Sequence, residues 1–314
     1  MTDLLLHASY DIAPWTLICL GGFVGVLSGL LGVGGGVLMT PALHILGLPM
    51  PVAVATTLTQ MVASSLSGTI KHHSQANVSI PLTLVFGVPG ILGVLLGKEL
   101  MVFVSNDPQF FTNFSLVYAC FLIFMTFSML QRMLKKGQRK PSKIWTFGPS
   151  RDSSDGLYKI YYLPSMFFGS FVGVISGLTG LGGGFFYMPI MSQVMGVPLK
   201  VAVGSSLGIV LLSSLVGATT YGLAGMSELG IAAVIAVGSI VGSYMGASAT
   251  KYVKGAFLKM LFAMLVFVAA VSVFLKYFGQ QEASFYLLIS ASLLLLGLAL
   301  FNAASNFRKE RQNS

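Results

Sequence analysis

The feature that most constrains this chain is an apolar segment, broken by three glycines, that occurs twice. The first copy starts at Phe23 and reads Phe-Val-Gly-Val-Leu-Ser-Gly-Leu-Leu-Gly-Val-Gly-Gly-Gly; the second starts at Phe171 and reads Phe-Val-Gly-Val-Ile-Ser-Gly-Leu-Thr-Gly-Leu-Gly-Gly-Gly. Twelve of the twenty-one residues aligned from these phenylalanines are identical. After one inserted residue the match continues through Gly-x-Pro and a pair of hydroxyl residues. The chain is therefore built from two related halves.

Composition places both halves in a membrane. Apolar residues make up 55% of the chain and charged residues 9%, whereas soluble domains carry about 25% charged residues. Several apolar runs reach the roughly 20 residues that cross a bilayer. We therefore predict an all-α polytopic membrane protein in contact with the lipid bilayer. The net charge of +9 would suggest nucleic acid in a soluble protein, but here the basic residues lie in loops and set topology, so we expect no nucleic-acid partner.

The apolar runs predict two inverted-topology repeats and one extra helix. Each repeat consists of a glycine-broken re-entrant helix pair and three spanning helices. The regions are a first repeat (1–134), a basic cytoplasmic linker (135–160), a second, inverted repeat (161–278), and an extra C-terminal helix with a basic tail (279–314). The expected helical segments are 15–31, 37–46, 52–70, 82–104, 110–134, 161–181, 185–195, 201–221, 229–250, 257–277 and 285–301.

The distribution of basic residues indicates an orientation. If each re-entrant pair leaves the membrane on the side it entered, the first repeat crosses three times and the second is inverted. A cytoplasmic linker then puts sixteen of the eighteen lysines and arginines on the cytoplasmic side, as the positive-inside tendency favours. We predict an N-terminus outside and a C-terminus in the cytoplasm. The alternative treats 15–46 as one broken crossing and places the N-terminus inside.

The glycine runs predict an anion site. Three glycines in a row end a helix, and irregular backbone at membrane depth is tolerated only where it is buried in protein or lines a polar cavity. A short helix follows each run, and its first N–H groups lack partners within the helix and carry partial positive charge. Two such helix starts that meet near the midplane could hold an anion without lysine or arginine.

Polar side chains after each glycine run would complete the site. Thr56 and Thr57 align with Ser205 and Ser206, whereas Gln60 has no polar counterpart. The alternative for the hydroxyls is a hydrogen bond back to the preceding turn. The predicted substrate-binding residues are Gly34, Gly35, Gly36, Val37, Thr56, Thr57, Gln60, Ser64, Gly182, Gly183, Gly184, Phe185, Ser205, Ser206 and Ser213.

The remaining small and titratable residues are assigned structural roles. Glycines spaced four apart let helices pack closely, which we predict for Gly93, Gly97, Gly242 and Gly246. Cys19 and Cys120 lie in apolar runs and are interpreted as core residues. His44 fits a pore-lining or packed residue better than a proton relay, and His72 with His73 indicates an interfacial loop. No nucleophile–base pair, metal spacing or paired carboxylate is evident at membrane depth, so we predict no catalytic residues, no metal, no cofactor and no enzyme activity.

These motifs resemble the sulfite exporter TauE/SafE family, also called the toluene sulfonate uptake permease family. The resemblance rests on Gly-x-Gly-Gly-Gly with a later proline, Gly-x-Pro, Ala-x-Ala-Thr-Thr and Ala-x-Gly-Ser-Ser, and it covers Trp15 to Phe278. It implies transport of sulfite or an organosulfonate such as sulfoacetate across a bacterial inner membrane, with the two glycine runs and the hydroxyl pairs at the site. It leaves open which sulfur anion is carried and the oligomeric state, for which a homodimer is one arrangement.

The driving force is inferred from the scarcity of carboxylates. A proton-coupled carrier usually has an ionisable residue in its pathway, and His44 is the only such residue evident here. The membrane potential, negative inside, favours the exit of an anion. We therefore expect export from the cytoplasm. The alternative is an uptake permease for an organosulfonate or other organic anion, coupled to protons or sodium.

Overall fold

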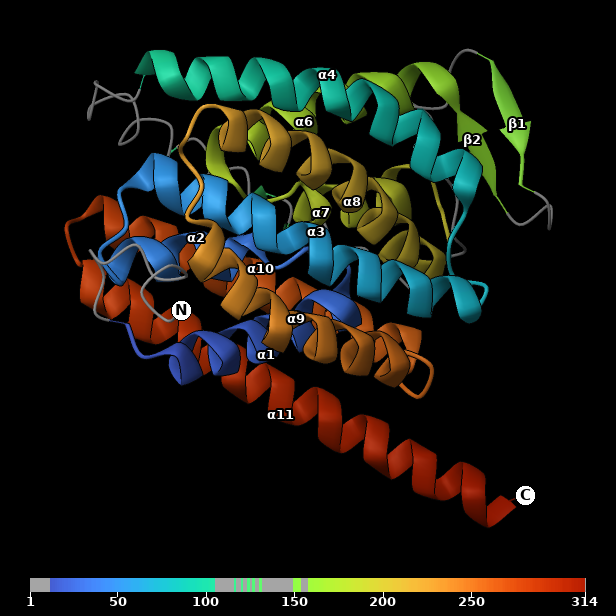
Figure 1. The fold of residues 1–314 in the computed structure, drawn as a ribbon. Helices are drawn as coiled ribbons and strands as arrows, with labels where there is room; N and C mark the ends of the chain where they lie inside the picture. Colours follow the sequence, from blue (N-terminus) through green and yellow to red (C-terminus); the bar gives the residue numbers. More distant parts are fainter. Residues whose placement is uncertain are drawn as a thin grey trace. The chain divides into compact units, whose positions relative to one another are not determined.

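The computed structural model describes residues 12–104, 149–153 and 158–313, with scattered positions between 116 and 131. Apart from one hairpin, the described elements are helices (Figure 1), so the predicted all-α class is confirmed. The elements are α1 Pro14–Leu31, α2 Gly36–Ile45, α3 Met50–Ser74, α4 Ile80–Val104, β1 Ser150–Asp152, β2 Lys159–Tyr161, α6 Tyr162–Thr179, α7 Gly184–Pro189, a π-helical turn Ile190–Val194, α8 Leu199–Leu223, α9 Leu229–Ala249, α10 Gly255–Tyr277 and α11 Gln281–Asn313. Most of the expected helix 110–134, most of the linker and the first eleven residues lie outside the described residues.

Seven of the described helices are long and apolar enough to cross a membrane, so the chain is a multi-pass membrane protein. They are α1, α4, α6, α8, α9, α10 and α11. Helix α3 is not among them because threonine, serine and glutamine lower its mean hydropathy. Its 25 residues nevertheless span about 37 Å at 1.5 Å per residue. That α3 crosses the bilayer therefore stays a prediction.

Two helical segments differ from the expected ones. Helix α11 continues to Asn313, past the predicted end at 301, because the alanine, arginine, lysine and glutamate that follow favour helix. The expected helix 185–195 divides into α7 and a π-helical turn at Pro189. Proline has no N–H to donate to the carbonyl four residues earlier, which interrupts the α-helical hydrogen bonding at that point.

The end of the linker forms a hairpin that the sequence did not predict. Strands β1 and β2 pair antiparallel, with Ser150 opposite Tyr161 and Asp152 opposite Lys159. Between these pairs Arg151 faces Ile160, whose side chain is buried. The hairpin thereby holds the chain at the start of α6.

The described helices fall into two compact units that do not follow chain order. Helices α1–α4, the hairpin and α6–α9 belong to the first unit, and α10 and α11 belong to the second. In the second unit the buried Ser272 of α10 and Ser284 of α11 exchange hydrogen bonds. The Ser272 hydroxyl donates to the Ser284 carbonyl at 2.9 Å, and the Ser284 hydroxyl donates to the Ser272 carbonyl at 2.7 Å.

Glycines bring two helix pairs of the first unit into backbone contact. A Cβ at Gly242 in α9 would lie 2.9 Å from the Gly22 carbonyl carbon of α1, and one at Gly93 in α4 would lie 2.8 Å from the Val174 nitrogen of α6. The same closeness holds at Gly97 and Gly246, so the predicted packing role of these four glycines is confirmed.

Helices α3 and α8 occupy equivalent places in the two repeats and pack against each other in antiparallel directions. Gly68 of α3 lies against Leu207 of α8, whereas Gly217 of α8 lies against Leu58 of α3. Later residues of one helix thus face earlier residues of the other, so the two helices run antiparallel. This favours the inverted relation of the repeats, which stays a prediction.

Candidate functional site

Both glycine runs form tight reversals of the backbone. Gly34 and Gly35 have φ of +83° and +85°, and Gly182 and Gly183 have φ of +73° and +72°. Residues with a side chain rarely adopt these positive φ values, so the backbone requires glycine at these four positions. A Cβ at Gly35 would lie 2.8 Å from Cγ1 of Val24, well inside α1. The chain therefore folds back beside α1 before α2 begins, which favours the re-entrant arrangement over a single broken crossing.

The two glycine runs lie against each other. A Cβ at Gly36 would lie 2.7 Å from the carbonyl carbon of Leu181, and one at Gly184 would lie 2.7 Å from that of Val33. We call Gly34–Gly36 and Gly182–Gly184 the glycine segments; all six residues are buried. Val37 and Phe185, which follow them in α2 and α7, are also buried. The structure thus brings these eight predicted site residues into one region.

Hydroxyl side chains from other helices donate hydrogen bonds to the carbonyls at the C-terminal ends of α1 and α6. A helix leaves its last carbonyls without partners, and within a membrane they must be satisfied by protein. The Ser206 hydroxyl donates to the Gly32 carbonyl at 2.7 Å. At the equivalent place in the other half, the Thr40 hydroxyl donates to the Gly180 carbonyl at 3.4 Å. These bonds make each break tolerable and tie it to the other repeat.

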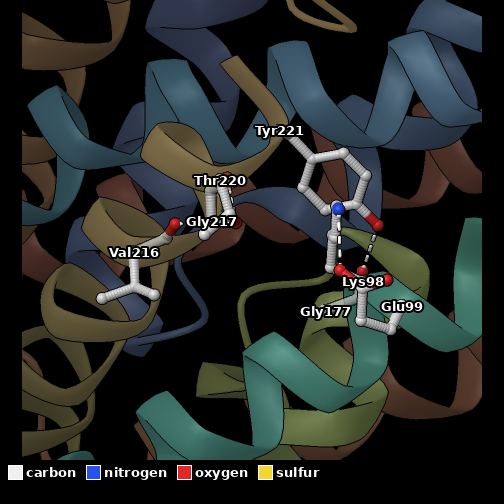
Figure 2. Close-up of polar contacts among 7 residues, drawn as sticks. All are labelled: Lys98, Glu99, Gly177, Val216, Gly217, Thr220 and Tyr221. Atoms are coloured by element: carbon white, nitrogen blue, oxygen red, sulfur yellow. Dashed lines mark hydrogen bonds and ion pairs between the residues drawn. The ribbon is translucent and has the colours of Figure 1, made fainter. Parts of the chain in front are cut away.

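A second pair of bonds serves the carbonyls one turn earlier. The Tyr221 hydroxyl donates to the Gly177 carbonyl at 2.8 Å, and Figure 2 shows the ring of α8 directed at that oxygen of α6. In the first half, His72 Nε2 lies 2.8 Å from the Gly29 carbonyl. His72 is fully buried within α3, so the interpretation of His72 as part of an interfacial loop is wrong. A single sequence gives no signal that the imidazole reaches a helix end.

Thr56 and Ser205, the first members of the two hydroxyl pairs, each bind a backbone N–H in the loop before a helix. The Thr56 hydroxyl accepts a hydrogen bond from the Glu228 backbone N–H at 3.1 Å, just before α9. The Ser205 hydroxyl accepts from the Ser79 N–H at 2.9 Å, just before α4. These bonds satisfy donors at helix starts, as capping side chains do. Thr56 and Ser205 therefore have a structural task in the described chain.

Thr57 and Gln60 are two of the α3 residues whose buried polar atoms lack a hydrogen-bond partner among the described residues; Ser65, Thr69 and Nδ1 of His72 are the others. The side chains of Thr57 and Gln60 are both buried. Three residues apart on a helix, they lie on one face. A buried polar group without a partner costs about 1–3 kcal/mol. Their counterparts differ, because Ser206 is bonded to Gly32 and Ile209 is apolar.

Ser28 and Ser176, which the prediction omitted, have the same character. They occupy equivalent positions before the two breaks, and each hydroxyl is buried without a partner among the described residues. The Cβ of Ser28 lies 3.8 Å from where a Cβ at Gly35 would be. Their occurrence in both copies of the repeated segment was the signal that could have identified them.

Ser64 lies about two turns beyond Thr57 in α3, and Ser213 lies about two turns beyond Ser206 in α8. The Ser64 hydroxyl donates to the Met61 carbonyl of its own helix at 3.3 Å. The Ser213 hydroxyl lies near that of Tyr187, since a Cβ at Gly90 would be 3.6 Å from the former and 3.0 Å from the latter. Ser64 therefore contacts Met61 and Ser213 contacts Tyr187, and neither contact involves the glycine segments.

Other predicted roles have different outcomes. His44 is half-buried, and its Nδ1 lies 2.9 Å from the carbonyl of Leu48, which follows the end of α2.

Cys19 and Cys120 are both exposed, so their interpretation as core residues is wrong. An apolar run in a membrane helix has a lipid-facing side as well as a packed one. No group of three or more histidine, cysteine, aspartate or glutamate side chains suited to a metal occurs in the part of the chain that the structure describes.

Two contacting helix breaks in a multi-pass protein are typical of membrane transporters, and similar proteins carry that description. The probable membrane transporter protein YunE of Bacillus subtilis is 26% identical over 247 residues, covering 75% of this chain and 88% of that protein. A probable membrane transporter protein of Haemophilus influenzae is 25% identical over 282 residues, covering 83% and 98%. The probable membrane transporter protein MJ0441 of Methanocaldococcus jannaschii is 26% identical over 265 residues, covering 80% and 91%.

The family follows from a match to most of the chain. The model of the sulfite exporter TauE/SafE family matches residues 17–273. The chain therefore belongs to the sulfite exporter TauE/SafE family and is a membrane transporter. No solved structure matches it.

Proposed function

We propose that this protein exports a small sulfur-containing anion, sulfite or an organosulfonate such as sulfoacetate, from the cytoplasm across a bacterial inner membrane. The description of the family supports the substrate class. The observation that carries the proposal is the contact of the two glycine segments with each other and with Met61 of α3. The same helix carries Thr57 and Gln60, whose buried polar atoms have no partner among the described residues.

The chemistry of the site suits a sulfonate. Its three oxygens accept hydrogen bonds and share one negative charge. The glycines have no side chains, so a ligand can approach their peptide N–H groups, and the start of α2 adds partial positive charge. The Thr57 hydroxyl and the Gln60 amide can each donate one further hydrogen bond. The anion would thus be held without a fixed cation.

The direction of transport rests on charge. With the linker and the tail in the cytoplasm, the basic residues lie on the side that the positive-inside tendency favours. A membrane potential that is negative inside then favours anion exit by about 2.3 kcal/mol per charge per 100 mV. The antiparallel course of α3 and α8 supports the inverted repeats that this topology needs.

Apolar substitutions of similar shape test the site. Thr57→Val and Gln60→Met remove hydrogen-bonding groups that have no partner among the described residues, so we expect thermal stability to hold or rise. The affinity for the anion should fall by about tenfold, the effect of one lost hydrogen bond to a charged ligand. Calorimetry of the purified protein with sulfite, sulfate, thiosulfate and short sulfonates measures both effects together with a thermal melt.

The matched control is Thr56→Val, one position earlier. It removes the acceptor of the Glu228 N–H, so it should lower the melting temperature and leave affinity close to that of the wild type. Unchanged affinity in both Thr57→Val and Gln60→Met rejects the site. Absence of binding to every anion of the panel rejects the substrate class.

A further inference from the structure

Two apolar side chains occupy the space at the glycine segments. The Cε of Met61 lies 2.7 Å from where a Cβ at Gly34 would be, and it is closer still to that position at Gly182. Val210 Cγ1 lies 2.7 Å from the same point at Gly34 and 3.3 Å from that at Gly182. Both side chains are fully buried. Met61 and Val210 therefore each touch both glycine segments.

These two residues are equivalent in the two repeats. Each follows the second hydroxyl of its pair by four residues, Met61 after Thr57 and Val210 after Ser206. Residues four apart lie on the same helix face, so Met61 shares the face that carries Thr57. Met61 and Val210 also lie where α3 and α8 cross, between the contacts at Leu58 and Leu207.

We propose that Met61 and Val210 form an apolar plug over the substrate site, and that Met61 is the residue that opens it and limits the size of the solute. The proposal rests on the proposed function. An anion seated on the amides of both glycine segments would occupy the place of the Met61 methyl group, so the two exclude each other. The anion can bind only after this side chain moves.

The two members of the plug differ in mobility. Methionine is unbranched, with three rotatable bonds, and it fills irregular spaces adaptably. Valine is branched at Cβ and in a helix holds essentially one rotamer. Met61 is accordingly the moving part and Val210 the fixed wall. The length of the Met61 side chain sets how much room its displacement creates beside Thr57 and Gln60.

Size selectivity tests the plug in proteoliposomes. With Met61→Ala, transport of hexanesulfonate relative to methanesulfonate should rise about tenfold, because the space is permanently larger. Met61→Leu conserves volume and should keep the wild-type ratio. Met61→Val is a milder truncation for which an intermediate ratio is expected. A wild-type ratio in both Met61→Ala and Met61→Val, with folded protein verified by gel filtration, overturns the proposal.

A reporter cysteine tests the plug without any sulfonate. In a background carrying Cys19→Ala and Cys120→Ala, Thr57→Cys should react about tenfold faster with a small cationic methanethiosulfonate when Met61→Ala is added. Met61→Leu should not raise the rate. Leu58→Ala also cuts away a buried side chain of α3 and controls for loosened packing; its rate should match the parent.

The two experiments separate the two proposals. Faster cysteine modification in a protein that transports no sulfonate keeps the plug and rejects the proposed substrate class. Sulfonate transport by the wild type, with a cysteine rate that Met61→Ala leaves unchanged, rejects the plug and keeps the proposed function. Equal acceleration by Leu58→Ala and Met61→Ala also rejects the plug, because packing alone would then explain the reactivity.

Discussion

Equivalent residues of the two repeats share backbone tasks and differ in their chemistry. Thr56 and Ser205 both accept from the N–H that precedes a helix. One residue later the halves diverge, because Ser206 is bonded to a helix-end carbonyl and Thr57 has no partner among the described residues. Of α3 and α8, the two helices with these residues, α3 therefore carries most of the buried polar atoms that have no partner among the described residues, and those of Gln60 are included.

The hydroxyl of Tyr221 offers a direct measure of what a capped helix end contributes. Tyr221→Phe removes the donor to the Gly177 carbonyl and leaves that oxygen buried without it. We expect the free energy of unfolding to fall by about 1–3 kcal/mol, read from denaturation in mixed detergent. Tyr286→Phe serves as a control because Tyr286 is 68% exposed. Equal stability of the two variants would contradict the capping role.

At the scale of helices, glycine determines which elements touch. Helix α1 packs on α9, and α4 packs on α6, through glycines whose absent side chains allow backbone contact. Each pair joins one repeat to the other, so main-chain contacts form part of the interface between the repeats, beside the crossing of α3 and α8. Without a hydrophobic driving force between helices in lipid, such close packing supplies much of the association.

Two glycine-to-alanine substitutions separate packing from helix propensity. At Gly242 an added Cβ would overlap the Gly22 carbonyl, whereas at Gly222 nothing lies within 4 Å. Gly242→Ala should lower stability by about 1–3 kcal/mol through overpacking. Gly222→Ala should be neutral or stabilise by about 0.5–1 kcal/mol, because alanine favours helix. Thermal melts of the two purified variants make the comparison, and a loss of stability at both positions would contradict this account.

For the whole molecule, the proposed direction of transport rests on charge and topology. The described spanning helices have few ionisable residues between their ends, and the proposed site would hold the anion with peptide amides in place of fixed cations. The membrane potential is then the force that acts on the charged solute. Family membership establishes that the chain is a transporter, and the direction remains a proposal with its own test.

Imposed potentials supply that test. Sulfoacetate efflux from loaded proteoliposomes should accelerate when valinomycin and a potassium gradient make the interior negative, and slow when the sign is reversed. Each charge gains about 2.3 kcal/mol per 100 mV. Met61 is unaltered here, so the result bears on the driving force alone. Transport that ignores the potential and requires a proton or sodium gradient would instead support the coupled uptake permease.

The sequence alone was sufficient to predict most of the described helices, because composition and glycine runs act locally. The positions of the breaks and of most described helix ends follow from where apolar runs meet glycine or proline. The hairpin at 150–161 and the division at Pro189 were not predicted, since both depend on which neighbours the backbone finds. Cys19 and His72 were misassigned because a pattern along the chain does not show which side of a helix is packed. Cys19 lies on an exposed side of an apolar helix, and His72 is buried although it lies near a polar helix end.

By itself the sequence determined a duplicated membrane chain with two helix breaks, because an internal repeat and three consecutive glycines leave few other folds in a bilayer. Only the tertiary structure decided which polar groups are already bonded and which remain without a partner among the described residues. It also decided that Met61 and Val210 meet both glycine segments. Such contacts join residues far apart in the chain, and a pattern along one sequence carries no distance between them.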